Sequence, residues 1–312
     1  MRKFIRSFKL SYKIFNFFKK SQLIHNLPHY KKYGLTKKYY SAVSSEDFIG
    51  IESPLNLYDA HDSATEMPKQ TGFKALDESV KSKLLPWSSE GYVVLDAFFS
   101  EQEVDAFNKE VVDLLEKKKV KFRYQNKIMF AIRDSVLLRN AGDHKKLLNI
   151  LNVLLGKKVN LFQSINFLTG SQQHTHSDSI HMSTFPYGNL IAIWIALEDI
   201  TADCGPLHYY PGSHKLPYMM NGSYGNAGTN HRLGKKNYAD YTQHIQSVIT
   251  KNNLTKKIFL AKKGDVFIWH ANLLHGGEKV TNSKSSRKSM VFHYYSTDAI
   301  CFYEVTQRPT LK

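Results

Sequence analysis

The sequence predicts a mainly β protein with flanking helices, of the sandwich or jelly-roll kind. Beyond Lys158, short runs of β-branched and aromatic residues are separated by clusters of Gly, Pro, Asn and Ser, a pattern typical of many short strands. Before Lys158, two segments instead place apolar residues at helical spacing. No run of about 18 uncharged apolar residues occurs, so the sequence predicts no transmembrane helix.

The individual elements follow from local signals, which begin at Trp87. Ser100 and Glu103 have the spacing of a capping box and start a helix that ends in lysines 117–119. Gly156 closes a second helix, at 144–155. Strands are expected at 91–95, 159–167, 190–197, 257–261, 265–269 and 289–295, with a Gly- and Asn-rich loop at 221–231 and a helix at 238–251.

Most of the net charge of +16 lies in the N-terminal part of the chain. The first 45 residues contain eleven Lys and Arg and no Asp or Glu, which leaves only +5 for the remainder. Nothing downstream looks like a module that reads nucleic acid, so no such partner is expected. The two cysteines, Cys204 and Cys301, are too few for a disulfide framework and favour a reducing, cytoplasmic setting.

The basic segment at 1–45 has helical periodicity, and three interpretations of it are open. Arg2, Arg6, Lys9, Lys13 and Lys20 form one stripe, and Phe4, Phe8, Tyr12 and Phe15 lie on another face. The segment is read as a helix packed on the domain, as a peripheral membrane contact through residues 1–20, or as an organelle-targeting peptide. Residues 46–86 are read as a lead-in with turns, and 87–312 as the main domain.

The first half of a candidate metal site is His176-Ser177-Asp178. On an extended strand, residues two apart project to the same face, so His176 and Asp178 can reach one metal. An imidazole and a carboxylate suit Fe(II). The pair alone is common by chance, and His174 could equally pair with His176. We interpret His174 and His181 as polar neighbours of the site.

The second half follows an apolar strand. Gly264 and Asp265 open that strand, and His275 comes after it beside two glycines, where the backbone can bend closely around a metal. Two His and one carboxylate leave three coordination positions open. Arg287 and Ser289 share a face and could clamp a distal carboxylate, although Arg287 taken alone reads as a surface charge between Lys284 and Lys288.

Together these motifs resemble the phytanoyl-CoA dioxygenase family. The resemblance rests on Glu90 to Leu95, His176-x-Asp178, Gly205-Pro206-Leu207, Tyr210 to Lys215, Gly264-Asp265, His275 and Arg287-x-Ser289, and it covers about two thirds of the chain. It implies a double-stranded β-helix (cupin-like jelly roll) and an Fe(II)- and 2-oxoglutarate-dependent dioxygenase that uses O2 and hydroxylates a small molecule. The interval from His275 to Arg287 is a residue or so longer than usual, and residues 1–86 have no counterpart.

The resemblance also implies roles for single residues. Iron is held by His176, Asp178 and His275, and 2-oxoglutarate by Arg287 and Ser289, with Gln163 a further contact. His214 belongs to a structural turn and is not a ligand. Because Asp178 is present where related halogenating enzymes have a small residue, hydroxylation is expected. Apart from the resemblance, two aromatic residues are candidates for the pocket wall: Trp194, which is expected to contact the substrate, and Tyr209. The alternative interpretation is that both belong to the plain hydrophobic core.

Two other functions stay open from the sequence. The first is a non-catalytic jelly roll in which the metal-binding residues are vestigial. The second is a protein that binds membranes or polyanions through the basic N-terminal segment.

Overall fold

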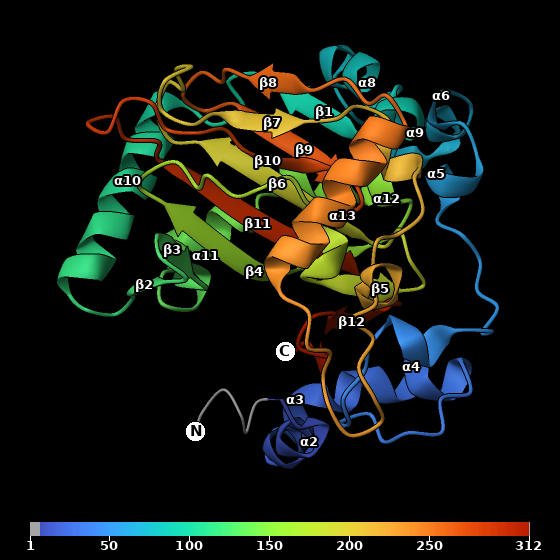
Figure 1. Ribbon diagram of the computed structural model, residues 1–312. Helices are drawn as coiled ribbons and strands as arrows, with labels where there is room; N and C mark the ends of the chain where they lie inside the picture. Colours follow the sequence, from blue (N-terminus) through green and yellow to red (C-terminus); the bar gives the residue numbers. More distant parts are fainter. Residues whose placement is uncertain (1–6, 312) are drawn as a thin grey trace.

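The computed structural model describes residues 7–311, and its largest element is a seven-stranded antiparallel sheet (Figure 1). The central strands of this major sheet are buried along their whole length, because helices cover one face of the sheet and a smaller sheet covers the other. Its strands, in spatial order, are β1 (Tyr92–Leu95), β9 (Val266–His270), β6 (Leu190–Ala196), β11 (Ser289–Ser296), β4 (Val159–Phe167), β3 (Lys127–Met129) and β2 (Phe122–Arg123).

Two three-stranded sheets complete the β structure. The one that faces the major sheet contains β10 (His275–Gly277), β7 (Leu207–Tyr209) and β8 (Lys257–Phe259). Between these two sheets lies a core that includes Trp194, Phe267, Trp269 and Tyr209. The other sheet contains β13 (Arg308–Pro309), β12 (Ile300–Tyr303) and β5 (Ser183–Phe185). Two facing antiparallel sheets confirm the predicted jelly roll.

Helices cover the outer face of the major sheet. They are α10 (Glu101–Glu116), α11 (Val136–Gly142) and α12 (Lys145–Leu155), with η4 (Ala131–Arg133) between strand and helix. Their apolar residues share one core with Ile193 of β6 and Phe292 of β11. The predicted capping box is present: Glu103 N–H donates to Ser100 Oγ at 3.3 Å, and Ser100 N–H donates to Glu103 Oε2 at 2.9 Å.

The segment predicted as a lead-in with turns consists of short helices. They are α5 (Leu57–Ala60), α6 (Ser63–Glu66), η3 (Met67–Lys69), α7 (Thr71–Lys74) and α8 (Glu78–Leu84), and α9 (Trp87–Glu90) follows at the start of the predicted main domain. Each of these helices is three to seven residues long, which is too short to show a helical period in the sequence. Tyr58, Met67 and Leu84 are nevertheless buried in the core beneath the major sheet. The segment therefore packs as part of the same body.

The described part of the basic segment lies against the β5–β12 sheet. It contains α2 (Lys9–Phe17), α3 (Lys20–Leu23), η1 (Ile24–Asn26), α4 (Leu27–Lys32) and, after a turn, η2 (Ser45–Phe48). Tyr30 and Val43 are buried with Phe185 and Phe302. Arg2, Phe4 and Arg6 of the predicted stripes lie outside the described residues. Across residues 7–311, no helix has the length and apolarity needed to span a membrane.

One further helix, α13 (Tyr238–Lys251), crosses in front of the sheets in the view of Figure 1. Its Tyr241 and Ile245 are buried in one cluster with Ile180 and Leu274. The predicted range of 238–251 is confirmed. The remaining short turns of helix are η5 (Asp178–Ile180), η6 (Ser213–Lys215) and η7 (Asn221–Tyr224). The helix α13 thus packs on residues next to two of the predicted metal ligands.

Candidate metal centre

His176, Asp178 and His275 form a compact, buried group. One candidate ligand atom from each lies within 4.8 Å of the others, and all three side chains are buried. Asp178 Oδ1 lies 3.8 Å from His176 Nε2 and 3.7 Å from His275 Nε2. The three residues whose spacing predicted a metal site are therefore together in space.

Backbone pairing holds the two histidines side by side. His176 N–H donates to His275 O and His275 N–H donates to His176 O, both at 2.9 Å, which extends the β10–β7 sheet by one bridge. The spacing of His176 and Asp178 predicted that both lie on one extended strand, but Asp178 lies beyond the extended stretch. It opens η5, while Ser177 before it stays extended. The turn still directs the carboxylate towards both imidazoles.

The hydrogen bonds of the two imidazoles decide which nitrogen is free. His176 Nδ1 lies 2.8 Å from the His174 carbonyl oxygen, and His275 Nδ1 lies 2.9 Å from the Leu273 carbonyl oxygen. Because a carbonyl only accepts, each Nδ1 carries the proton and each Nε2 presents its lone pair. Both Nε2 atoms face Asp178 Oδ1, so the donor set is preorganised for a cation.

Asp178 is oriented by two residues that sequence reasoning missed. Trp269 Nε1 donates to Asp178 Oδ2 at 2.8 Å, and His293 Nε2 lies 3.6 Å from the same oxygen. Oδ1 is thereby left to face the two histidines. A polar residue at position 293, on the same face of β11 as Ser289, was the available signal for His293.

Electrostatics favour this donor set in its metal-binding protonation state. Burial, and next His275, lower the pKa of His176 well below its ordinary value, so the ring is neutral at pH 7. Burial opposes the ionisation of Asp178, but the neighbouring His275, His293 and His176 outweigh it and hold its pKa below the ordinary range. Two imidazoles and one carboxylate on one side of a cation match the facial triad of non-haem iron proteins.

Glycine at 276 is required by close packing rather than by curvature around a metal. A Cβ there would lie 2.7 Å from the Gln173 carbonyl oxygen and from the His208 ring. His208 is itself fixed, with Nδ1 at 2.8 Å from Glu278 Oε1 and Nε2 at 2.8 Å from Thr175 Oγ1. The absence of a side chain at Gly276 lets β10 approach the 173–176 segment, which places His275 beside His176.

Arg287 is a buried cation without an acidic partner among residues 7–311. It is 2% exposed, its Cζ lies 5.3 Å from the Trp194 ring and 5.9 Å from the Phe167 ring, and its Nη1 donates to Ser289 Oγ at 3.2 Å. Its Nε has no hydrogen-bond partner in this part of the chain. Burial lowers the pKa of Arg287 to about 10, so it stays charged at pH 7. A buried, unpaired guanidinium calls for an anion.

Gln163 lies on the same face of β4 as Ile165 and Phe167, which belong to the core between the two sheets. It pairs with His293 of β11, whose ring lies beside Asp178. Its Oε1 accepts from Tyr303 Oη at 3.2 Å, and its Nε2 contacts Met182 Sδ at 3.7 Å. Trp194 is buried and packs against the Arg287 guanidinium, and Tyr209 packs against Phe267 in the same core.

A second set of polar side chains that the sequence did not single out surrounds the His–Asp–His group. Gln173 Nε2 lies 3.0 Å from His176 Nε2, 3.2 Å from His181 Nε2 and 3.4 Å from Tyr238 Oη. Lys127 Nζ donates to Gln173 Oε1 at 2.7 Å, and burial lowers the pKa of Lys127. His181, predicted as a polar neighbour, also stacks on the Tyr238 ring.

His214 lies outside the metal group. Its ring is 5.4 Å from that of His270, and its Nε2 lies 3.2 Å from the Ser88 carbonyl oxygen. It also fills the space beside Gly91, where a Cβ would meet the imidazole at 2.3 Å. This placement fits the structural role predicted for the 211–214 turn.

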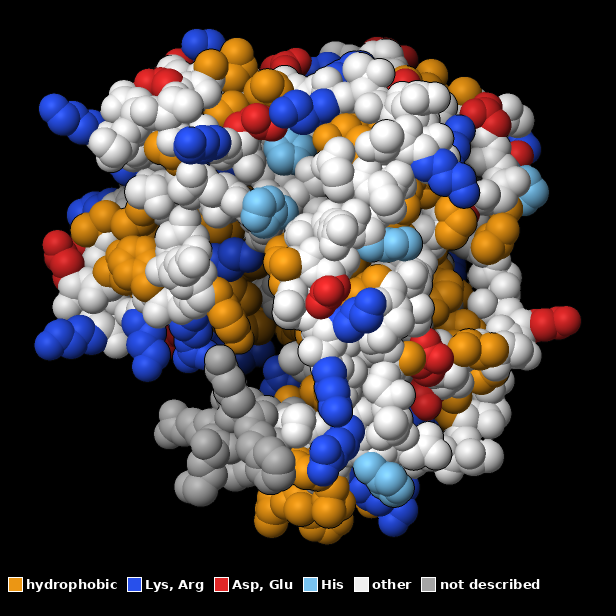
Figure 2. Space-filling view, viewed as in Figure 1, with side chains coloured by type: hydrophobic (Ala, Val, Ile, Leu, Met, Phe, Trp, Pro, Cys, Tyr) orange, Lys and Arg blue, Asp and Glu red, His pale blue; other side chains and the backbone are white. Residues whose placement is uncertain are grey.

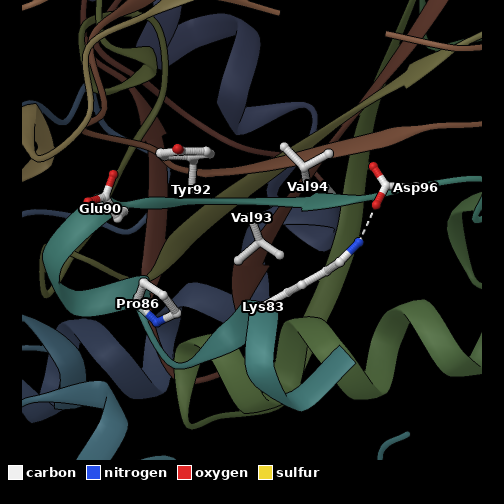
Figure 3. A pocket seen from close by; sticks show the side chains of 7 residues that line it. All are labelled: Lys83, Pro86, Glu90, Tyr92, Val93, Val94 and Asp96. Atoms are coloured by element: carbon white, nitrogen blue, oxygen red, sulfur yellow. Dashed lines mark hydrogen bonds and ion pairs between the residues drawn. The ribbon is translucent and has the colours of Figure 1, made fainter. Parts of the chain in front are cut away.

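A surface hollow of about 310 Å³ along β1 shares no residue with the metal group (Figure 3). Figure 3 shows Lys83 reaching Asp96 across it, an ion pair that neutralises both charges. Val93 points to the α8 side of β1, and Tyr92 and Val94 point to the other side. The hollow brings no reactive groups together, so the chemistry is assigned to the His–Asp–His group.

Comparison with known proteins agrees with this geometry. The sequence profile of the phytanoyl-CoA dioxygenase family matches residues 87–289. A curated relative, phytanoyl-CoA dioxygenase domain-containing protein 1 of Danio rerio, is 25% identical over 158 residues, which are 49% of this chain and 48% of the relative. The chain thus matches about half the length of that relative.

Several solved structures share the fold. The carbocyclase SnoK of nogalamycin biosynthesis is 20% identical, with 74% of this chain and 88% of that chain covered and a TM-score of 0.58. EctD of S. alaskensis, solved with 2-oxoglutarate and 5-hydroxyectoine, is 18% identical, with 71% and 76% covered and a TM-score of 0.53. HygX of Streptomyces hygroscopicus, solved with nickel and 2-oxoglutarate, is 16% identical, with 74% and 90% covered and a TM-score of 0.52.

Proposed function

Since the chain belongs to the phytanoyl-CoA dioxygenase family, we propose that it is an Fe(II)- and 2-oxoglutarate-dependent dioxygenase that hydroxylates a small molecule. The observation that carries the proposal is the arrangement of His176 Nε2, His275 Nε2 and Asp178 Oδ1 around one point, with both histidine tautomers fixed by backbone carbonyls. Iron bound there, with 2-oxoglutarate and O2, supplies oxidative decarboxylation to succinate and CO2 and the oxidant for a substrate C–H bond.

The protein's own residues provide positions and charges. Trp269 and His293 hold the Asp178 carboxylate so that one oxygen faces the metal position. Arg287 and Ser289 supply the charge and the hydroxyl that would bind the distal carboxylate of 2-oxoglutarate, inside a wall of aromatic rings that excludes water. Trp194 supports the guanidinium, and its contact with a substrate stays a prediction, as does the contact of Gln163 with 2-oxoglutarate.

Hydroxylation is proposed over halogenation because the third ligand position carries a carboxylate. Asp178 is 4% exposed and bonded to Trp269, so it is built into the centre. The titratable groups His181 and Lys127 lie near Asp178, and burial lowers the pKa of His181 to about 4.

The proposal is tested with the full chain. We expect Fe(II) and 2-oxoglutarate, added without oxygen, to give the weak visible charge-transfer band of the iron chelate, and oxygen then to release succinate. Asp178→Ala removes one of three ligands, so the band and the succinate should both be lost. Asp134→Ala, at an exposed aspartate remote in sequence from the site, is the control and should behave as the parent. A parent protein with neither signal would favour the non-catalytic jelly roll.

A further inference from the structure

The first described helix presents its apolar side to solvent. In α2, Leu10, Ile14 and Phe17 are spaced four and three residues apart and form one stripe, and their exposed fractions are 63%, 53% and 46%. Asn16, on the opposite side, is only 2% exposed. A surface helix of a globular protein normally buries the apolar stripe and exposes the amide. The orientation of α2 is the reverse.

This orientation is fixed by contacts that do not involve the apolar stripe. Lys9 N–H donates to the His231 carbonyl oxygen at 2.9 Å. The Arg232 guanidinium lies 4.6 Å from the Phe8 ring, and that of Arg308 lies 5.6 Å from the Tyr12 ring. The side of the helix that carries these residues is thus attached to the body, and the stripe is held facing outward.

The exposed stripe belongs to a larger patch. Six of the sixteen large hydrophobic side chains exposed in residues 7–311 lie within fifteen positions of each other at this end. We call them the N-terminal apolar patch: Leu10, Ile14, Phe15, Phe17, Phe18 and Ile24. Figure 2 shows hydrophobic side chains gathered at the bottom of the molecule, beside Lys and Arg, where Figure 1 places α2 and α3. Contiguous exposed apolar surface of this kind marks a binding surface.

The charges around the patch select its partner. Lys13 and Lys20 are exposed, Lys20 Nζ lies 5.0 Å from the Phe17 ring, and no acidic residue occurs before Glu46. Lysine heads above aromatic and aliphatic side chains fit the phosphate and acyl layers of an anionic lipid surface. A second copy of the chain fits poorly, because joining two such patches would bring their lysines together.

We propose that the N-terminal apolar patch docks the protein on membranes that contain anionic lipids. Leu10, Ile14 and Phe17 enter the boundary between headgroups and acyl chains, and Lys13 and Lys20 lie at the lipid phosphates. The docking leaves the metal group unchanged, since it uses none of that group's residues. It therefore stands or falls independently of the dioxygenase activity.

The test uses flotation of the full chain with vesicles, because Leu23 and Tyr30 are buried and removal of the segment would expose the core beneath it. One set of vesicles is phosphatidylcholine, and the other contains about one third phosphatidylglycerol. We expect binding to the anionic vesicles, weakened by salt, and little binding to the neutral ones. The triple variant Leu10→Ser, Ile14→Ser, Phe17→Ser should bind at least about tenfold more weakly.

Charge variants and matched controls complete the experiment. Lys13→Glu with Lys20→Glu should remove the preference for anionic vesicles. Lys117→Glu with Lys119→Glu, at exposed lysines after α10, should bind as the parent does, and so should Val136→Ser, at a side chain that is 77% exposed.

The outcomes of these experiments distinguish a membrane from a second copy of the chain as the partner of the patch. Unchanged thermal unfolding and succinate release in the patch variants show that the fold and the metal group are intact. Absence of parent binding to either vesicle, or equal binding of the parent and the triple variant, overturns the proposal. A concentration-dependent dimer that the triple variant abolishes, without vesicle binding, would assign the patch to a second copy.

Discussion

At the scale of single residues, the metal group depends on contacts with side chains and backbone carbonyls that are not themselves candidate ligands. Trp269 and His293 hold one oxygen of Asp178, and two backbone carbonyls hold the Nδ1 protons of the histidines. Such supporting bonds orient ligands and tune their basicity. The bond from Trp269 is a single side-chain contact, so a substitution can remove it while all three ligand residues are kept.

Trp269→Phe removes the hydrogen bond to Asp178 and keeps an aromatic ring. We expect affinity for Fe(II) to fall about 10- to 100-fold, measured by anaerobic titration of the metal-free protein. Trp194→Phe is the matched control, because Trp194 Nε1 has no partner within the described chain. Equal losses in the two variants would show that the effect is one of packing.

Arg287→Lys tests the predicted carboxylate clamp. Lysine keeps the charge but loses the planar fork and its stacking on Trp194, so the KM for 2-oxoglutarate should rise about tenfold or more with little change in iron affinity. Lys288→Ala changes the neighbouring cation, which is paired with Glu198, and should leave both constants as they are. An unaltered KM in Arg287→Lys would place the clamp elsewhere.

At the scale of elements, one buried carboxylate joins segments that are far apart in sequence. Glu304, after β12, is fully buried and accepts hydrogen bonds from Ser45 N–H at 2.9 Å, Ser45 Oγ at 2.6 Å and Asn221 N–H at 3.1 Å. It therefore connects the basic N-terminal segment and the 221–231 loop to the C-terminal strands. The predicted boundary at residue 45 coincides with this contact.

Glu304→Ala should lower the free energy of unfolding by about 3 kcal/mol, because two backbone N–H groups are left buried without acceptors. Urea unfolding monitored by tyrosine and tryptophan fluorescence gives the value. Glu46→Ala, at an exposed neighbour of Ser45, is expected to change it by less than about 0.5 kcal/mol. A small effect of Glu304→Ala would mean that the basic segment is held by its apolar contacts alone.

At the scale of the whole molecule, stability is expected to depend on pH through the lead-in segment. The Asp59 side chain, on α5, is 24% exposed, and its Oδ1 lies 3.5 Å from His270 Nε2. Burial raises the pKa of Asp59 to about 6, although His214 acts against the increase. Burial also lowers the pKa of His270 to about 4, so that ring is neutral at pH 7 and gives Asp59 no full counter-charge.

A carboxyl whose pKa is higher in the folded than in the unfolded state is stabilising below pH 4, and this contribution is lost as the pH rises through 6. Asp59→Asn should therefore add about 2 kcal/mol at pH 8, a value reduced for partial exposure, and progressively less towards pH 4. Thermal and urea unfolding at several pH values measure it, with Glu52→Gln, at an exposed site, as the control. An equal gain at pH 8 and pH 5 would contradict the assignment.

The sequence by itself determined the jelly roll and the central residues of the site. The strands at 159–167 and 289–295, the helix at 238–251 and the capping box at Ser100 were readable because hydrophobic periodicity and capping are local properties. His176, Asp178 and His275 were found because each belongs to a short motif that can be recognised in the sequence: His176-x-Asp178, and His275 beside two glycines. The short helices before Trp87 were missed, since none is long enough to show a period.

Only the tertiary structure decided which long-range partners complete each local signal. The register of the strands brings Trp269 and His293 to Asp178. Aromatic rings on β4 and β6 cover Arg287 and make it a buried cation, whereas its sequence neighbours suggested an exposed one. The predicted apolar face of the N-terminal helix included Phe8 and Tyr12, but packing places these two rings against Arg232 and Arg308. The stripe that faces outward is a different one, made of Leu10, Ile14 and Phe17. Periodicity defines the faces of an element, and the direction each face points depends on contacts with residues distant in the chain.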